Sequence, residues 1–154
     1  TADVVVTLND PQVPALAKSL ATTRSAAAVE LWRDRMDGAV VVVGNAPTTL
    51  FRCLEIIAGG GPRPAAIIGC PVGFVGAAES KAALARAKDA VPFLVVHGTR
   101  GGSAMASSVV NALAIAGEKL ISRAVAIEFN TAIVASSMYA IVWLNRCHKQ
   151  YDCL

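Results

Sequence analysis

Short apolar runs alternate with longer amphipathic segments along most of the chain. The runs cover residues 3–8, 39–43, 65–69 and 91–96, and each is bounded by polar residues, glycine or proline. Their β-branched content predicts four strands. A run without any polar position, such as the valine run of 39–43, indicates a strand that is covered on both faces.

Two helices are expected before the second strand. The first begins at Asn9-Asp10-Pro11, where a capping carboxylate precedes proline, and ends near Thr22. The second places Ala28, Trp32 and Met36 at helical spacing and ends at Gly38.

Three further helices are expected, each after a strand. One begins near Pro47 with Phe51, Leu54 and Ile57 on one face, one covers Ala77 to Ala87, and one opens at Ser103. Strands and helices that alternate in this way predict an α/β fold with a parallel sheet and right-handed crossovers.

The pattern changes after Ala114. Residues 1–114 are expected to form the α/β domain, and 115–154 an unassigned apolar extension with an atypical C-terminal helical tail over 124–144. A membrane-spanning helix needs about 20 predominantly apolar residues. Glu128 and Asn130 fall within that length and are costly in lipid, so association with a membrane is disfavoured.

Composition narrows the class of protein. The 154 residues are 55% hydrophobic and 16% charged, with a formal net charge of +3. Disordered chains are poor in apolar residues and nucleic-acid binders carry clustered basic residues, so neither class fits. The four cysteines include no C-x-x-C pair, which favours a reducing cytoplasm over a disulfide-rich or zinc-binding domain.

The loops that follow the strands carry glycines and polar residues. In a parallel sheet the carboxyl ends of the strands meet at one edge, where ligands bind. Each loop also leads into a helix N-terminus, whose free N–H groups and partial positive charge suit anions. Arg24 and Arg100 add guanidinium groups for carboxylate or phosphate. The sequence therefore predicts an edge that binds a ligand with several separated negative groups.

Single reactive residues are few. The segment 69–76 lacks the G-x-G-x-x-G spacing of dinucleotide loops, and no Walker motif occurs. His97 ends a strand at the binding edge and could exchange protons, but a solvent-facing histidine is favoured. A metal site in the tail at 147–153, which holds two cysteines and His148, is disfavoured. Cys70 is expected to be a buried, inert thiol.

Several segments occur in the order found in one enzyme family. They are Leu8–Pro11, Thr23–Ala28, Gly44–Thr48, Pro71–Lys81 and Gly101–Ala104. With them, residues 3–114 resemble precorrin-8X methylmutase, an isomerase of cobalamin biosynthesis. The long segment 71–81 is the most specific of these motifs.

The resemblance implies a methyl migration on the corrin ring of precorrin-8X that yields hydrogenobyrinate, in a homodimer without an external cofactor. It leaves open whether the substrate contains cobalt. The many acetate and propionate groups of such a substrate agree with the anion-binding edge inferred from the loops. The residues expected to bind it are Arg24, Ser25, Asn45, Thr48, Gly73, Phe74, Val75, Gly76, Glu79, Ser80, Gly101, Gly102 and Ser103.

No catalytic residue is assigned from the sequence. The resemblance places the catalytic histidine in a segment that precedes the first strand, and neither His97 nor His148 matches it. The chain begins at Thr1, directly before a strand, so we expect a processed chain or a fragment that starts inside a domain. Two alternatives stay open: a non-catalytic corrinoid-binding fragment, and a different α/β enzyme that binds a phosphorylated nucleotide at the same edge.

Overall fold

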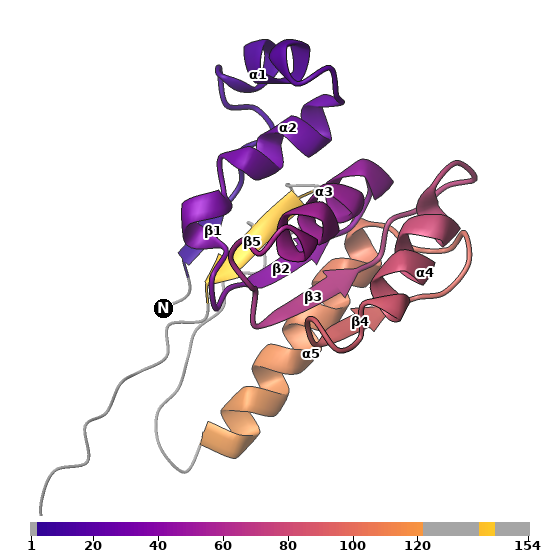
Figure 1. Cartoon of the computed structure of the whole chain (residues 1–154). Coiled ribbons are helices and arrows are strands. Elements are labelled where there is room, and N and C mark those ends of the chain that lie inside the picture. The colour runs from indigo at the N-terminus through magenta and orange to yellow at the C-terminus, as the bar shows by residue number, and fades with distance from the viewer. Residues whose placement is uncertain (1–2, 122–138, 144–154) are drawn as a thin grey trace, which may run out of the picture.

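The computed structural model describes residues 3–121 and 139–143, and its centre is a five-stranded sheet (Figure 1). The strands are β1 (Asp3–Val5), β2 (Val40–Val43), β3 (Ala66–Gly69), β4 (Phe93–Val95) and β5 (Tyr139–Trp143), in the spatial order β1-β5-β2-β3-β4. Strands β2, β3 and β4 pair in parallel, while β5 is antiparallel to both β1 and β2. The predicted α/β fold with parallel strands is confirmed.

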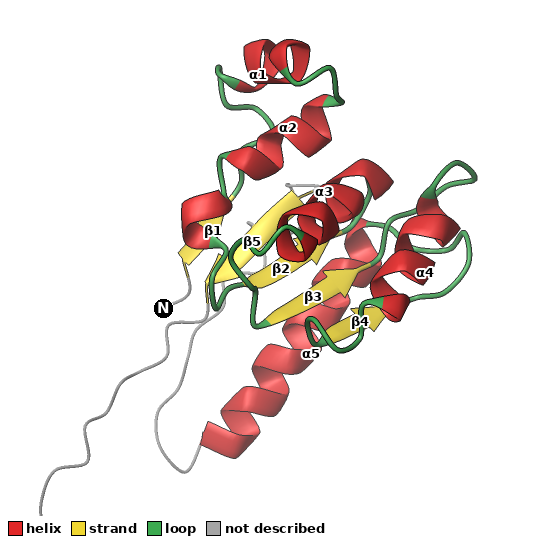
Figure 2. Ribbon diagram, in the orientation of Figure 1, coloured by secondary structure: helices red, strands yellow, loops and turns green. Residues whose placement is uncertain are grey.

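Helices cover both faces of this sheet (Figure 2). They are α1 (Val13–Ser19), α2 (Arg24–Glu30), α3 (Pro47–Ala58), α4 (Ala77–Arg86) and α5 (Ser103–Ile121), with a short 3-10 helix η1 (Arg33–Arg35) after α2. Because successive strand residues point to opposite faces, Val41 and Val43 pack in one apolar cluster with α3 and α4. Val42 packs with α5 in a second cluster.

Two of the expected helices differ in detail from the structure. The first begins at Val13 rather than at Asn9, because the Asp10 carboxylate accepts a hydrogen bond from the Gln12 N–H (2.9 Å) and stabilises a turn there. The second ends at Glu30 and is followed by η1, although Trp32 and Met36 are buried in the core as their spacing suggested.

The apolar face of α3 is rotated from the expected one. Leu50, Cys53 and Ile57 are buried, whereas Phe51 and Leu54 are only half-buried. The helix carries apolar residues around much of its circumference, so periodicity alone did not identify the side that faces the sheet. The stripe centred on Cys53 is the one that meets β2 and β3.

The expected C-terminal helix requires a correction. Helix α5 continues past Ala114 to Ile121, and residues 139–143, which lie within the range expected to be helical, form strand β5 between β1 and β2. The segment Tyr-Ala-Ile-Val-Trp is rich in aromatic and β-branched residues, which favour a strand. The rest of the tail, with Glu128, Asn130 and His148, lies outside the described residues. Within the described part of the chain, no helix is both long and apolar enough to cross a membrane.

Candidate functional site

Three loops leave the sheet at the carboxyl ends of β2, β3 and β4 and lie side by side (Figure 1). They cover residues 44–46, 70–76 and 96–102. Backbone hydrogen bonds join them: the Val72 N–H donates to the Asn45 carbonyl (3.3 Å), the Gly73 N–H to the Thr99 carbonyl (3.1 Å) and the Gly102 N–H to the Cys70 carbonyl (2.8 Å). The three loops therefore form one connected surface at the edge where the sequence predicted a site.

The N-terminus of α2 adds a fourth segment to this surface. The Thr23 hydroxyl caps α2 by accepting from the Ala26 N–H (3.2 Å), and it donates to the Thr48 hydroxyl (2.9 Å) at the start of α3. Arg52 on α3 binds Glu30 at the other end of α2 (2.6 Å), which ties the two helices together. We call the segments 23–25, 44–49, 70–76 and 97–103 the rim.

Two glycines allow the backbone segments of the rim to approach closely. A Cβ on Gly44 would lie 2.8 Å from the Cα of Ser103, so the first turn of α5 rests directly on the end of β2. A Cβ on Gly101 would overlap the carbonyl oxygens of Cys70 and Pro71. Since backbone atoms cannot move aside as a flexible side chain does, both positions require glycine.

An exposed apolar pair lies in the loop between β3 and α4. Phe74 is 92% exposed and Val75 is 90% exposed. Gly73 and Gly76 lie on either side of them. Their φ angles are +122° and +79°, a backbone conformation that residues other than glycine rarely adopt. Exposed apolar side chains beside anion-binding groups suit a ligand with apolar faces and a charged periphery.

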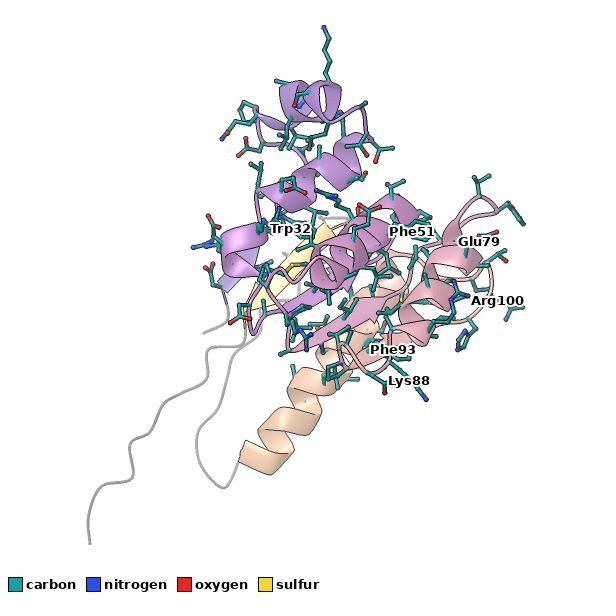
Figure 3. All side chains as sticks on the ribbon, in the orientation of Figure 1. Trp32, Phe51, Glu79, Lys88, Phe93 and Arg100 are labelled. Atoms are coloured by element: carbon teal, nitrogen blue, oxygen red, sulfur yellow. The ribbon has the colours of Figure 1, made fainter. Side chains whose placement is uncertain are left out.

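The rim also carries cations and helix N–H donors. Arg24 is exposed, and its guanidinium donates a long hydrogen bond, 3.4 Å, to the Leu8 carbonyl. Arg100 is exposed on the loop after β4, and Figure 3 shows it on the same side of the molecule as Glu79 at the start of α4. Helices α3, α4 and α5 all begin at the rim with N–H groups that suit anions.

The structure places most of the expected site residues on or next to the rim, but it buries one of them. Glu79 is exposed in the first turn of α4, next to the rim. Ser80 differs from the expectation, because its side chain is fully buried and its hydroxyl donates to the Ala77 carbonyl (3.0 Å) within the helix. The other expected residues lie on the rim: Arg24, Ser25, Asn45, Thr48, Gly73, Phe74, Val75, Gly76, Gly101, Gly102 and Ser103.

Lys81 is a feature of the site that the sequence reading did not single out. Its side chain is fully buried, and its ammonium donates to the carbonyl of Arg100 at 2.6 Å. Burial lowers the pKa of this lysine. The sequence did contain a signal for this burial, because Lys81 has the helical spacing of one face with Ala77, Ser80 and Leu84. All four residues of that face are buried in the structure.

The remaining reactive side chains are either enclosed or solvent-facing. Burial raises the pKa of the Cys70 thiol, an effect that nearby Lys81 partly opposes, and burial raises the pKa of Cys53 to about 12. Both thiols are therefore protonated near neutral pH and weakly nucleophilic. His97, the histidine within the described residues, is exposed at the end of β4, as expected. The described residues contain no group of three side chains suited to a metal ion.

The rim therefore carries groups suited to binding a ligand. Its guanidinium and N–H groups can hold carboxylates, and its glycines and exposed apolar residues can lie against a flat ring. Its one thiol, that of Cys70, is buried and protonated and is therefore a weak nucleophile.

Comparisons with known proteins point to one family. The family model described as precorrin-8X methylmutase (CbiC) matches residues 1–116. Two curated relatives with that name are 60% identical over 111 residues, in Pseudomonas aeruginosa, and 57% identical over 112 residues, in a Sinorhizobium species. These matches cover 72% and 73% of this chain and 53% of each relative. The chain thus spans about half the length of the curated relatives it matches.

A solved structure agrees with the sequence comparisons. A protein described as related to precorrin-8X methylmutase superimposes with a TM-score of 0.65 at 35% identity, over 71% of this chain and 56% of its own.

Proposed function

This chain belongs to the precorrin-8X methylmutase family, and we propose that its rim binds precorrin-8X and its product hydrogenobyrinate. The observation that carries the proposal is that hydrogen bonds join the four segments of the rim into one surface. Arg24 lies on the first of these segments along the chain and Arg100 on the last. A corrin carries carboxylate side chains around a flat ring. Cations at separated positions, on a surface that also carries an exposed apolar pair, complement that arrangement.

The reaction we propose for the intact enzyme is the migration of a methyl group between neighbouring carbons of the corrin. The methyl group leaves one ring carbon and joins another within the same molecule, so the formula is unchanged and no external oxidant or reductant is needed. The share of this chain is to hold the ring in one orientation. Binding energy from peripheral carboxylates then fixes the geometry at the reacting carbons.

Titration with hydrogenobyrinate tests the proposal. The visible absorbance of the corrin should shift on binding to the 154-residue chain, and excess ATP should not displace it. Displacement by ATP would favour an α/β enzyme that binds a phosphorylated nucleotide. The absence of any shift at saturating protein would contradict the proposal.

Arg24→Ala should weaken this binding. A hydrogen bond to a charged partner contributes about 1.5–3 kcal/mol, which corresponds to an affinity loss of roughly tenfold or more. Arg33→Ala is the matched control, because Arg33 is an exposed arginine beyond the opposite end of α2. Equal affinity of the two variants, measured by the same absorbance titration, would remove Arg24 from the site.

We also propose that the protein works in the cytoplasm as a homodimer, with the site near the interface. The exposure of Phe74 and Val75 supports a partner surface close to the rim, since adjacent exposed apolar side chains are a feature of interaction sites. Light scattering should give a mass of twice 15.9 kDa. A monomer at micromolar concentration would contradict the dimer and leave the binding proposal intact.

A further inference from the structure

The fully buried Lys81 has no counter-ion among the described residues. None of the ion pairs in that part of the chain involves it, and its recorded partner is the carbonyl of Arg100. Lysine is almost never fully buried without a partner of opposite charge, because burial removes the ammonium from water. A buried charge of this kind needs an explanation beyond packing.

The hydrogen bond of Lys81 controls the orientation of one peptide group on the rim. The described chain contains no cis peptide bond, so the carbonyl of Arg100 and the N–H of Gly101 point in opposite directions. The ammonium holds the carbonyl at 2.6 Å from the buried side. The Gly101 N–H is thereby directed away from Lys81, and it donates to no backbone carbonyl of the described residues.

The neighbouring contacts make this orientation rigid. The loop is held on its other side by the Gly102 N–H, which donates to the Cys70 carbonyl, and by the Thr99 carbonyl, which accepts from the Gly73 N–H. A carbonyl that accepts from an ammonium is polarised, and its peptide N–H becomes a stronger donor. Arg100, on the same peptide, is exposed and forms no ion pair with a described residue.

We propose that Lys81 is a positioning residue: its ammonium holds the Arg100 carbonyl so that the Gly101 N–H and the Arg100 guanidinium together bind one carboxylate of the corrin. The inference rests on the proposed function and adds to it the residue that prepares this part of the site. Lys81 does not touch the substrate. The bound carboxylate supplies, through the loop, the negative charge that the protein lacks beside the buried ammonium.

The test compares Lys81→Met with wild type in the full 154-residue chain. Methionine is unbranched and of similar length but can neither donate nor carry charge. Lys88→Met is the matched control, since Lys88 is an exposed lysine beyond the C-terminal end of α4 (Figure 3). Two probes are titrated by visible absorbance: hydrogenobyrinate, and its fully methylated ester, which has no negative charge.

We expect Lys81→Met to bind hydrogenobyrinate about tenfold more weakly, the effect of losing a charge-assisted contact, and to bind the ester as wild type does. Its thermal unfolding temperature should not fall, because replacing an unpaired buried charge by an apolar side chain is often neutral or stabilising. Lys88→Met should match wild type with both probes. A lysine that only supports the fold would instead lower the unfolding temperature and weaken both probes alike.

The outcomes separate the two proposals. If wild type prefers the acid to the ester and Lys81→Met keeps the same preference, the role of Lys81 is wrong and the proposed function stands. If wild type binds neither probe, the proposed function fails and the role of Lys81 fails with it. Lys81→Gln, which keeps an N–H donor without charge, covers the case in which Lys81→Met does not fold. Failure of both variants to fold would show Lys81 to be structural.

Discussion

Gly73→Val should abolish the binding of hydrogenobyrinate while the chain keeps its circular dichroism spectrum. Gly73 has a φ angle of +122°, which valine does not adopt without strain, and its N–H holds the Thr99 carbonyl at 3.1 Å. A Cβ there meets no protein atom within 4 Å, so the added side chain would project into the open space beside the rim. Both effects act on the ligand side of the loop, and we expect an affinity loss of at least about 100-fold, or roughly 3 kcal/mol.

Gly60→Val is the matched control for backbone strain. Gly60 also has a positive φ angle, +77°, and no atom within 4 Å of a built Cβ, but it follows the C-terminal end of α3, away from the rim. The two variants should lose similar amounts of thermal stability, and only Gly73→Val should lose binding. Normal binding by Gly73→Val would show that the segment 71–76 serves the fold alone.

The alternation of strands and helices could be predicted because its causes are local. The valine run that ends at Val43 and the isoleucine pair before Gly69 are fully apolar. The first is followed by a helix that begins at Pro47, and the second by a helix that begins directly after Gly76. Buried parallel strands and helix N-termini leave such signals in single segments. Their order along the chain was enough to place the loops at one edge of the sheet.

Strand β5 could not be predicted in the same way. Its place between β1 and β2 depends on antiparallel pairing with Val4 and Val41, which are far from it in sequence. Within a long apolar stretch, periodicity alone does not separate a helix from a strand. The choice is made by the neighbouring strands, and these are known only once the sheet is assembled.

The loops of the candidate site could be predicted from the sequence, whereas its interior could not. Glycines and arginines at strand ends indicate an anion-binding edge without any knowledge of packing. The burial of Lys81 and Ser80 depends on which face of α4 meets the loop after β4, and the Ala-rich sequence of that helix marks the face only weakly. A polar side chain on a weakly marked face can point to a ligand or into the core, and Ser80 points into the core.

The chemical groups on the rim bear on which steps of the reaction the 154-residue chain can carry out by itself. Its loops supply cations, donors and close backbone approaches, whereas the Cys70 thiol on the rim and the Cys53 thiol in the core are buried and protonated. A methyl migration in a corrin also needs a proton held near the ring, and imidazole is best suited to this near neutral pH. The histidine within the described residues is His97. It is exposed after β4, and it lies outside the segments that carry the family resemblance.

Binding and turnover should therefore separate in the 154-residue chain. The chain spans about half the length of the curated relatives it matches, so the groups that complete the reaction need not all be present. We expect it to bind hydrogenobyrinate but to convert precorrin-8X at least about 100-fold more slowly than the Pseudomonas aeruginosa relative, the low end of the effect of losing a general acid–base group.

A single-turnover assay that follows the visible spectrum from precorrin-8X to product measures both binding and conversion. The Pseudomonas aeruginosa relative, assayed in the same way, is the positive control. Full-rate conversion by the 154 residues, lost in His97→Ala, would contradict this expectation and assign the proton to His97.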